Sequence, residues 1–308
     1  MNFHEELADR TAWTENVVKT FLPEESGTQK AIMEAMNYSV MAGGKRLRPL
    51  LMHETYRMFG GTGRVILPLM AAIEMVHTYS LVHDDLPAMD NDQYRRGKLT
   101  THAKYGHAMG VLAGDGLLNY AFETAMTAFD CGEDPERVAK ALRIIGRKAG
   151  IYGMIGGQVV DVQSTGRAID QEELDFIYEL KTGALLEASM MVGAVLAGAS
   201  DEEVEAVEKI ASDVGLAFQI RDDILDVTST LETLGKPINS DDRNEKTTYV
   251  TIHGLEQASK DVEEISERAI EHLKALPYEN EFLLELIKSL ITEKNKGDKE
   301  WYWKRSIR

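Results

Sequence analysis

Apolar residues recur along most of the chain at intervals of three and four, which is the spacing of one face of an α-helix. The longest such series is Val204, Val207, Ile210, Ala211, Val214, Ala217, Phe218, Ile224 and Leu225, and a shorter one is Val262, Ile265, Ala269, Ile270 and Leu273. The alternation of apolar and polar residues that is typical of strands is almost absent. The pattern therefore predicts an all-α protein with roughly ten or more helices.

Turn-forming residues divide these helical stretches. No proline lies between Pro135 and Pro237, which suits a long stack of helices. Clusters of Gly, Pro, Asn, Asp and Ser predict breaks at residues 59–63, 130–135, 164–170, 228–244 and 277–280. Since no shift in composition and no fixed-period repeat marks a boundary, we expect one all-helical domain over residues 1–308.

Charge and composition narrow the function. A net charge of −17 argues against nucleic acid as a partner, because phosphate backbones need a basic surface. The single cysteine, Cys131, excludes a disulfide within the chain and fits a reducing compartment. The first residues are polar and acidic, with no signal peptide. The apolar stretch from Gly183 to Ser200 carries Glu187, so we expect a buried helix rather than a membrane span, in a cytoplasmic protein.

The first candidate for chemistry is the segment Asp222-Asp223-Ile224-Leu225-Asp226. Asp222 and Asp226 are four residues apart, so they share one face of a helix. Two ionised carboxylates this close repel each other unless a cation lies between them, and Mg²⁺ prefers oxygen ligands. A solvated acidic helix face would give the same pattern. The apolar neighbours, from Ala217 to Leu225, favour the metal site.

A second aspartate cluster, Asp84-Asp85-Leu86-Pro87-Ala88-Met89-Asp90, is spaced differently. Asp84 and Asp90 are six residues apart and would point away from each other on an ideal helix. Pro87 is expected to break the helix, which would let Asp90 fold back toward Asp84. An acidic helix C-terminus is the alternative, but negative charge is unfavourable there without compensation. We therefore predict a second metal-binding cluster.

Basic residues suited to phosphate stand out in this acidic chain. Gly43-Gly44-Lys45-Arg46-Leu47-Arg48-Pro49 combines phosphate-binding side chains with glycines that allow close backbone approach. Arg95 and Arg96 directly follow the first aspartate cluster, where a salt-bridge network is the alternative to a diphosphate site. His77 lies two helical turns before Asp84, and a core histidine is the alternative there. Further lysines near breaks or apolar helices are Lys181, Lys236 and Lys246.

Together these segments resemble the trans-prenyl diphosphate synthases, and within that family the bacterial farnesyl-type enzymes. The resemblance runs from about Tyr38 to Tyr249. It includes the Gly43–Pro49 segment, residues 77–83 before the first aspartate cluster, Arg95-Arg96-Gly97, residues 112–118, Gly156-Gly157-Gln158, Lys181-Thr182-Gly183 and residues 218–221 before the second cluster. It implies an antiparallel helical bundle around a large central cavity, normally a homodimer.

The resemblance also implies roles for individual residues. Asp84, Asp90 and Asp222 would bind three Mg²⁺ ions, supported by Asp85, Asp223 and Asp226. The allylic substrate, dimethylallyl or geranyl diphosphate, would be held by Arg95, Lys181 and Lys236. Isopentenyl diphosphate would be bound by Lys45, Arg48, His77 and Arg96, while Thr182 and Gln219 would lie beside the developing carbocation. Asn239, Leu99 and the C-terminal residues 293–308 depart from the family pattern.

Product length is the remaining expectation. Tyr79 and Ser80 precede Asp84 by five and four residues, about one turn deeper along the helix, so a bulky Tyr79 would form the floor of the cavity. With Pro87-Ala88 inserted in the first cluster, this resembles the farnesyl pattern and predicts a fifteen-carbon product. The alternatives are a geranylgeranyl diphosphate synthase, a terpene cyclase, a non-catalytic subunit of a larger synthase and a helical interaction protein.

Overall fold

The computed structural model describes residues 2–132, 134–228 and 247–291, and these residues fall into two compact units. Unit 1 contains the described parts of residues 2–53 and 62–142, and unit 2 contains residues 54–61 and the described parts of 143–291. Two helices, α3 (Leu47–Met58) and α7 (Pro135–Ala149), contribute residues to both units. The expectation of a single domain stays a prediction.

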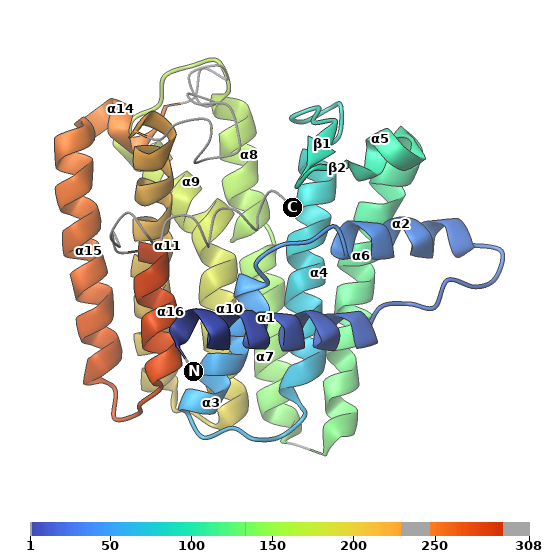
Figure 1. Cartoon of the computed structure of the whole chain (residues 1–308), viewed down its shortest axis with the longest axis horizontal. Helices are drawn as coiled ribbons and strands as arrows, with labels where there is room; N and C mark the ends of the chain where they lie inside the picture. Colours follow the sequence, from blue (N-terminus) through green and yellow to red (C-terminus); the bar gives the residue numbers. More distant parts are fainter. Residues whose placement is uncertain (1, 133, 229–246, 292–308) are drawn as a thin grey trace. The chain divides into compact units, whose positions relative to one another are not determined.

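Unit 1 is organised around two long helices (Figure 1). Its other elements are α1 (Phe3–Thr20), α2 (Lys30–Val40), α4 (Ile66–Asp84), the strands β1 (Tyr94–Arg95) and β2 (Lys98–Leu99), α5 (Thr101–Tyr105), α6 (His107–Met126) and the 3₁₀ helix η1 (Thr127–Cys131). α4 packs lengthwise against α6, and α1 and α2 pack on this pair. β1 and β2 form a two-residue hairpin whose turn residues, Arg96 and Gly97, both have positive φ.

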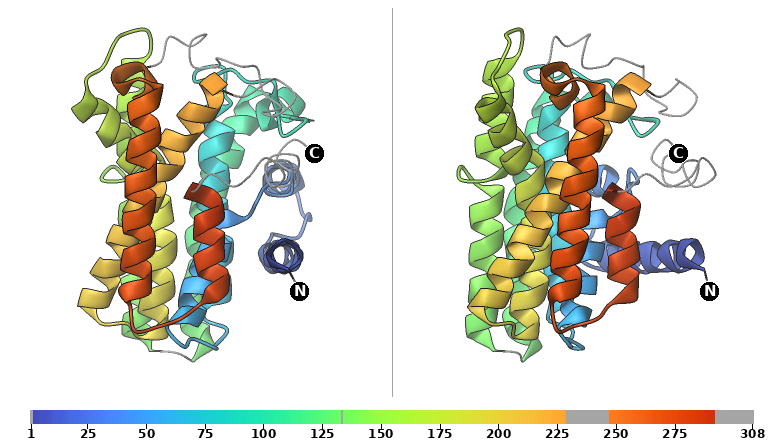
Figure 2. Two further views of the ribbon diagram at one scale, coloured as in Figure 1. Left: turned by 60° about the vertical axis from the view of Figure 1, so that its left-hand side comes forward. Right: turned by 90° about the vertical axis from the view of Figure 1, so that its left-hand side faces the viewer.

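Unit 2 is also helical (Figure 2). Its elements are α8 (Met154–Ser164), α9 (Gln171–Ile177), the π-helix η2 (Tyr178–Gly183), α10 (Ala184–Ala197), α11 (Asp201–Thr228), α14 (Tyr249–His253), α15 (Leu255–Ala275) and α16 (Glu281–Ile291). α11 packs against both α10 and α15. The all-α prediction is confirmed, and helices end or begin at the predicted breaks near residues 59, 135, 164 and 281.

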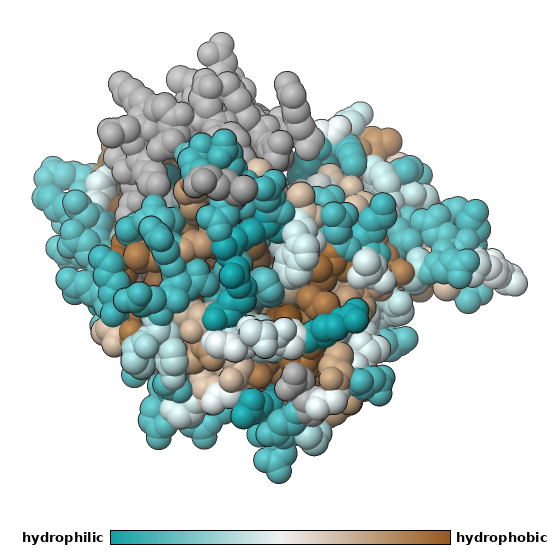
Figure 3. All heavy atoms as spheres, turned by 60° about the horizontal axis from the view of Figure 1, so that its bottom comes forward, coloured by the Kyte–Doolittle hydropathy of each residue, from teal (hydrophilic) through white to brown (hydrophobic). Residues whose placement is uncertain are grey.

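Two stretches of the fold are long and apolar enough to cross a membrane, Ile66–Asp84 and Gln171–Ala197. Of their most apolar windows, 72% and 78% of the residues are buried inside the protein, as is expected for core helices. This burial agrees with the predicted core position of the segment from Gly183. Hydrophilic side chains cover much of the face seen in Figure 3.

Small residues hold the π-helix η2 close to its neighbours. A Cβ atom at Gly157 of α8 would clash with the backbone nitrogen of Lys181 and would lie 2.9 Å from the carbonyl carbon of Leu180. A Cβ atom at Gly215 of α11 would lie 3.1 Å from the Cα atom of Gly183. Glycine at these two positions therefore lets η2 lie in direct backbone contact with two helices. Such π-helical turns are often found at functional sites.

We predict that Gly157→Ala lowers the free energy of unfolding by about 1–3 kcal/mol, because the new methyl group forces η2 away from α8. Gly116→Ala in α6 is the matched control, since its Cβ would meet the flexible end of Met36, whose sulfur lies 2.9 Å away. The measurement is urea denaturation of both variants. Equal changes in the two variants would contradict the proposed role of Gly157.

Candidate active site

The first aspartate cluster lies at the C-terminal end of α4. The helix ends at Asp84, three residues before Pro87, and the backbone N–H of Asp90 donates to the carbonyl oxygen of Asp84 at 2.9 Å. Asn91, with φ of +54°, donates its N–H to the carbonyl of Leu86 at 3.1 Å. The predicted helix break is confirmed, and the chain folds back so that the backbones of Asp84 and Asp90 meet.

Asp85 lies between Asp84 and Asp90 in the sequence. Its carboxylate is paired with an arginine side chain instead of facing solvent. Nε of Arg95 donates to Oδ1 and Oδ2 of Asp85 at 2.8 and 3.0 Å, and Nη2 lies 2.6 Å from Oδ1. Burial raises the pKa of Asp85, while the hydrogen bonds and charge of Arg95 oppose that shift. This fork-to-fork pair agrees with a supporting role for Asp85.

The glycine-rich basic segment approaches the hairpin closely. Nη1 of Arg96 donates a hydrogen bond to the carbonyl oxygen of Gly43. Gly44 has φ of +137°, and a Cβ atom there would lie 2.5 Å from Nη1 and 2.8 Å from Cζ of Arg96. Glycine is therefore favoured at position 44 by its backbone conformation, and the absence of a side chain leaves room for the end of the Arg96 side chain. The two basic segments that the sequence singled out are brought together.

Arg46 fixes the basic segment to α4. Its side chain is fully buried, Nη1 donates to Oε1 of the buried Glu74 at 2.7 Å, and Nη2 donates to the carbonyl oxygen of Val40 at 2.7 Å. Neither Arg46 nor Glu74 was predicted as a functional residue. A buried pair of this kind holds its neighbours in register, because breaking it would leave an uncompensated charge. The neighbours here are Lys45 and Arg48.

His77 lies among four arginines. Burial, followed by the positive charges of Arg48, Arg96, Arg95 and Arg46, lowers the pKa of His77 well below its usual value of 6.5. Burial also lowers the pKa of Arg48 to about 10, with Glu74 opposing that shift, so the guanidinium remains charged at neutral pH. We call His77, Arg46, Arg48, Arg95 and Arg96 the basic cluster. Such a gathering of cations favours a multivalent anion.

Tyr79, predicted as the cavity floor, is buried with 5% of its surface exposed, and its hydroxyl makes no hydrogen bond among the described residues. Burial, together with the charge of Asp84, raises the pKa of Tyr79 to about 12, so the side chain stays neutral. Ser80 is half-buried and donates its hydroxyl to the carbonyl oxygen of His77 at 2.9 Å. The chain-length role of both residues stays a prediction.

The second aspartate cluster lies in unit 2, near the C-terminal end of α11. A pocket there, which we call the acidic pocket, is lined by Asp161, Ser164, Arg167, Ile169, Leu174, Ile177, Tyr178, Lys181, Thr182, Gln219, Asp222, Asp223, Thr247 and Thr248. Lys181 and Thr182 come from the π-helix η2, whereas Gln219 and Asp222 come from α11. With Asp223, five of the predicted site residues therefore line this pocket.

The other two aspartates of this cluster are buried. Oδ2 of Asp223 accepts a hydrogen bond from the hydroxyl of Tyr178 and one from the backbone N–H of Tyr249 at 2.8 Å. Asp223 thus ties α11 to η2 and to the start of α14. Asp226 is 3% exposed and does not line the acidic pocket. Both positions agree with the predicted supporting roles, which stay predictions.

Several residues of these sites were missed from the sequence. Besides Arg46 and Glu74, the buried His102 lies 3.1 Å from the Thr100 hydroxyl and 3.3 Å from the Gln93 amide, and so supports the hairpin that carries Arg95. Asp161 of α8 lies 2.6 Å from the amino group of Lys181. The position of Asp161, three residues after the Gly156-Gly157-Gln158 motif, is a sequence signal that could have identified it as a candidate. Lys236, Lys246, Asn239 and the C-terminal residues lie outside the described residues.

The donor atoms present fit Mg²⁺. No group of three His, Cys, Asp or Glu side chains suited to a metal occurs among residues 2–132, 134–228 and 247–291. What these residues offer is carboxylates from Asp84, Asp90 and Asp222, all oxygen donors. Mg²⁺ is usually bound by one or two carboxylates together with water and substrate phosphates, so this donor set suits the ion.

An all-α fold with two aspartate motifs and a cluster of basic residues is typical of one class of proteins, the isoprenoid-type synthases. Among solved structures, the chain resembles a farnesyl/geranylfarnesyl diphosphate synthase from Zymomonas mobilis, with a TM-score of 0.83, 31% identity and coverage of 94% of this chain and 99% of that one. It also resembles the Helicobacter pylori geranyltransferase solved with magnesium and isoprenyl diphosphate, with a TM-score of 0.78, 30% identity and coverage of 94% and 96%.

Sequence relatives agree with the structural ones. The chain is 41% identical over 273 residues to a farnesyl diphosphate synthase of Geobacillus stearothermophilus, covering 87% of this chain and 90% of that one. It is 42% identical over 277 residues to a geranylgeranyl diphosphate synthase of Cyanophora paradoxa, covering 88% and 91%. The polyprenyl synthetase family model matches residues 29–286. The chain belongs to the polyprenyl synthetase family and is a trans-prenyl synthase.

We predict that Arg46→Met lowers the free energy of unfolding by about 3–5 kcal/mol, because it leaves the Glu74 carboxylate buried without its partner. The double variant Arg46→Met/Glu74→Leu should recover most of that loss. Arg137→Met is the control, since this arginine and its partner Asp134 are both about half-exposed and lie 3.6 Å apart. Chemical denaturation measures all three. A double variant no more stable than Arg46→Met would contradict this interpretation of the pair.

A second prediction concerns pH. Because the pKa of His77 is lowered in the folded protein, the unfolded chain binds more protons at this residue below pH 6.5, and stability falls as the pH falls. Between pH 7.5 and 5.5 this residue should account for a loss of about 1.4 kcal/mol. The loss should be smaller by that amount in His77→Gln, measured by urea denaturation at both pH values. If His77→Gln loses as much stability as the wild type between these two pH values, the prediction is wrong.

Proposed function

We propose that this protein is a magnesium-dependent farnesyl diphosphate synthase, which joins isopentenyl diphosphate first to dimethylallyl diphosphate and then to geranyl diphosphate. The observation that carries the proposal is the basic cluster. The positive charges of four arginines lower the pKa of His77, in a chain of net charge −17. Arg46 and Arg95 are paired with Glu74 and Asp85, so Arg48 and Arg96 are the two that would bind a small multivalent anion. The position of the basic cluster directly beside the Asp84–Asp90 turn supports a diphosphate as that anion.

The residues of the basic cluster divide by their surroundings. Arg48 and Arg96, with Lys45 and His77, are proposed to bind the diphosphate of isopentenyl diphosphate. Arg95 is bound to Asp85 and lies 4.0 Å from Asp92, so it is set among the acidic residues instead. We therefore assign Arg95 to the allylic diphosphate, together with Lys181 of unit 2 and Lys236, which lies outside the described residues.

Mg²⁺ is the proposed cofactor, three ions in all, with Asp84, Asp90 and Asp222 as direct ligands. When bound, Mg²⁺ neutralises the charge that develops on a departing diphosphate. The other three aspartates, Asp85, Asp223 and Asp226, would support the three ligands without binding Mg²⁺ directly. The printed description of the Helicobacter pylori relative, which is complexed with magnesium and isoprenyl diphosphate, supports this choice of cofactor and substrate.

The reaction follows from these charges. The C–O bond of the allylic diphosphate breaks, and its electron pair leaves with the diphosphate, which Arg95 and Lys181 stabilise. The double bond of isopentenyl diphosphate attacks the resulting allylic carbocation, forming a 1′-4 carbon–carbon bond. The oxygens of Thr182 and Gln219, which line the acidic pocket, would lie beside the positive charge. Loss of a proton, to the released diphosphate as base, completes the product.

Geranylgeranyl diphosphate synthase is the second candidate, because relatives of similar identity carry both names. Tyr79 favours the shorter product. Its ring is buried five residues before Asp84, so it would close the space available to a growing hydrocarbon chain. The insertion of Pro87 and Ala88 in the first aspartate cluster also supports the farnesyl type.

We further propose a cytoplasmic homodimer. On α6 the side chains of Val111 and Leu112 are 44% and 54% exposed, and on α8 those of Val159 and Val162 are 49% and 47% exposed. Val111 and Leu112 are adjacent in the sequence, and Val159 and Val162 are about one turn apart. Exposed apolar side chains of this size suit burial against a second copy. Light scattering should give twice the mass of one chain. A monomer at micromolar concentration would contradict the dimer.

The function is tested by incubating the purified protein with Mg²⁺, isopentenyl diphosphate and either dimethylallyl or geranyl diphosphate. We expect a fifteen-carbon diphosphate as the main product, identified by chromatography after removal of the phosphates. Addition of excess EDTA should abolish turnover. A twenty-carbon main product would favour the second candidate, and no turnover with either starter would refute a catalytic role.

Tyr79→Ala should lengthen the product by at least one five-carbon unit, because removing the ring deepens the cavity. Tyr79→Phe is the matched control, since it keeps the ring and removes the hydroxyl that has no described hydrogen-bond partner. Product chromatography checks both variants. Unchanged chain length in Tyr79→Ala would place the floor of the cavity at other residues.

A further inference from the structure

Lys181, which lines the acidic pocket together with Arg167, is held by a carboxylate from another helix. Its Nζ donates to Oδ2 of Asp161 at 2.6 Å. The two side chains are 28% and 14% exposed, so the pair is shielded on most sides but open to the pocket that both residues line. Asp161 belongs to neither aspartate motif, and the proposed function gives it no role.

One face of α8 contacts Lys181 at two points, its backbone nitrogen and its side-chain amino group. Gly157 and Asp161 are four residues apart, one helical turn, and so point the same way. Gly157 makes room for the backbone nitrogen of Lys181, as shown by the clash a Cβ atom would cause, and Asp161 takes the amino group. α8 therefore determines the position of the π-helical turn and the direction in which the lysine side chain extends.

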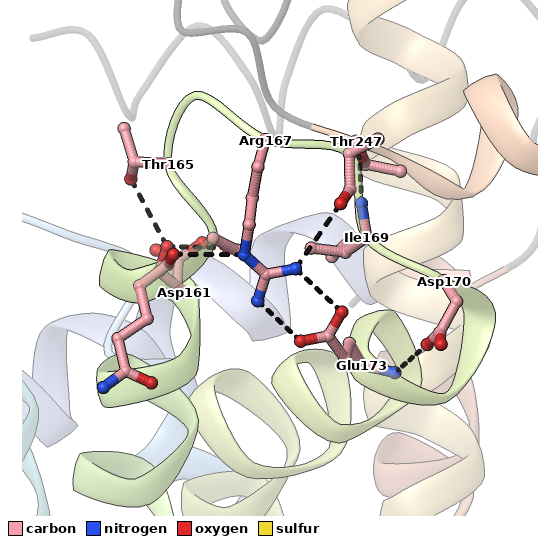
Figure 4. A network of polar contacts seen from close by, with 10 residues as sticks. Asp161, Thr165, Arg167, Ile169, Asp170, Glu173 and Thr247 are labelled. Carbon is pink, nitrogen blue, oxygen red and sulfur yellow. Dashed lines mark hydrogen bonds and ion pairs between the residues drawn. The ribbon is translucent and has the colours of Figure 1, made fainter.

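The end of α8 is itself fixed, as Figure 4 shows. The hydroxyl of Ser164 donates to the carbonyl oxygen of Asp161 at 2.8 Å. The hydroxyl of Thr165 donates to the same oxygen at 3.4 Å. Beyond them, Arg167 forms two hydrogen bonds with Glu173, at 2.9 and 2.6 Å. These contacts anchor the backbone from which the Asp161 side chain extends into the pocket.

Asp222 lines the same pocket, so it competes with Asp161 for the ammonium group of Lys181. A carboxylate that pairs with an ammonium group has fewer lone pairs for a metal ion. An ammonium group has three N–H donors, so one bond to Asp161 leaves two for other acceptors. A lysine held by Asp161 can thus contact a bound diphosphate while Asp222 keeps its oxygens for the cation.

We propose that Asp161 is a positioning residue that holds Lys181 toward the allylic diphosphate and away from the metal-binding carboxylate of Asp222. The proposal rests on the proposed function of the acidic pocket. In this proposal Asp161 acts through Lys181, with which it is paired, rather than on the reacting carbon atoms. Its loss should therefore weaken the use of the allylic substrate and of Mg²⁺, while the binding of isopentenyl diphosphate is unaffected.

The test is the isosteric variant Asp161→Asn, compared with Lys181→Met and with the double variant. We expect the KM for geranyl diphosphate to rise about tenfold in Asp161→Asn, since coupled pairs are typically worth 1–2 kcal/mol. The Mg²⁺ concentration for half-maximal rate should rise as well, and the KM for isopentenyl diphosphate should not. In the Lys181→Met background, Asp161→Asn should change the KM by less than about twofold.

Two further measurements separate positioning from folding. Calorimetry with a non-reactive thio analogue of geranyl diphosphate and Mg²⁺ should show the same loss of affinity without turnover. Asp213→Asn is the matched control, because it breaks the pair with Arg268 at an aspartate that is 16% exposed, much like Asp161, and that does not line the acidic pocket. It should keep wild-type KM values, and all variants should have melting temperatures close to that of the wild type.

The proposal is overturned if Asp161→Asn keeps the wild-type KM or binds the analogue more tightly, or if its effect is undiminished in the Lys181→Met background. Equal effects of Asp161→Asn on both substrates would also overturn it, since they would indicate a general structural defect. Turnover by the wild type establishes the proposed function independently of these outcomes, so the two failures are distinguishable. Asp161→Glu, which keeps the charge, should retain part of the wild-type affinity.

Discussion

Repulsion between like charges is the constraint on which both candidate sites depend. In unit 1 four guanidinium groups surround His77, with the carboxylates of Glu74 and Asp85 as partners. In unit 2 aspartates gather around a pocket with Lys181. Charges of the protein balance each gathering only in part, and the remaining repulsion favours ligands of the opposite sign. A diphosphate suits the basic residues and Mg²⁺ suits the aspartates of both clusters, and the substrates of a prenyl synthase bring both.

Backbone contact is what makes these charge clusters possible. Gly44 lets Arg96 reach the backbone of the basic segment, and Gly157 lets α8 touch the π-helix that carries Lys181. The helix break after Asp84 does the same for the first aspartate cluster, since it brings the backbone of Asp90 to that of Asp84. In each case a feature that weakens regular helix structure allows charged side chains to be placed where a straight helix could not hold them.

Much of this could be read from the sequence, and the limits have physical reasons. Helical periodicity predicted the fold class, because 3.6-residue spacing reflects burial on one face of a helix. Clusters of turn-forming residues predicted the breaks near residues 59, 135, 164 and 281, but not those after α1, α2, α7 and α10. The aspartate motifs were found because their spacing is local, whereas the roles of Lys181 and Gln219 came from the resemblance to the family. Arg46, Glu74, His102 and Asp161 were missed, since each matters through a partner distant in the chain. Nothing in the sequence around Tyr178–Gly183 indicates a π-helix, which depends on close packing against Gly157 and Gly215.

The most direct test is calorimetric titration of isopentenyl diphosphate in the absence of Mg²⁺. If the basic cluster binds this substrate through guanidinium groups, binding should be measurable without the metal and should weaken at least tenfold in Arg48→Gln, whereas Arg57→Gln should bind like the wild type. A non-reactive analogue of geranyl diphosphate should bind only when Mg²⁺ is added. Binding of isopentenyl diphosphate that requires Mg²⁺, or that is unchanged in Arg48→Gln, would contradict this division between the two sites.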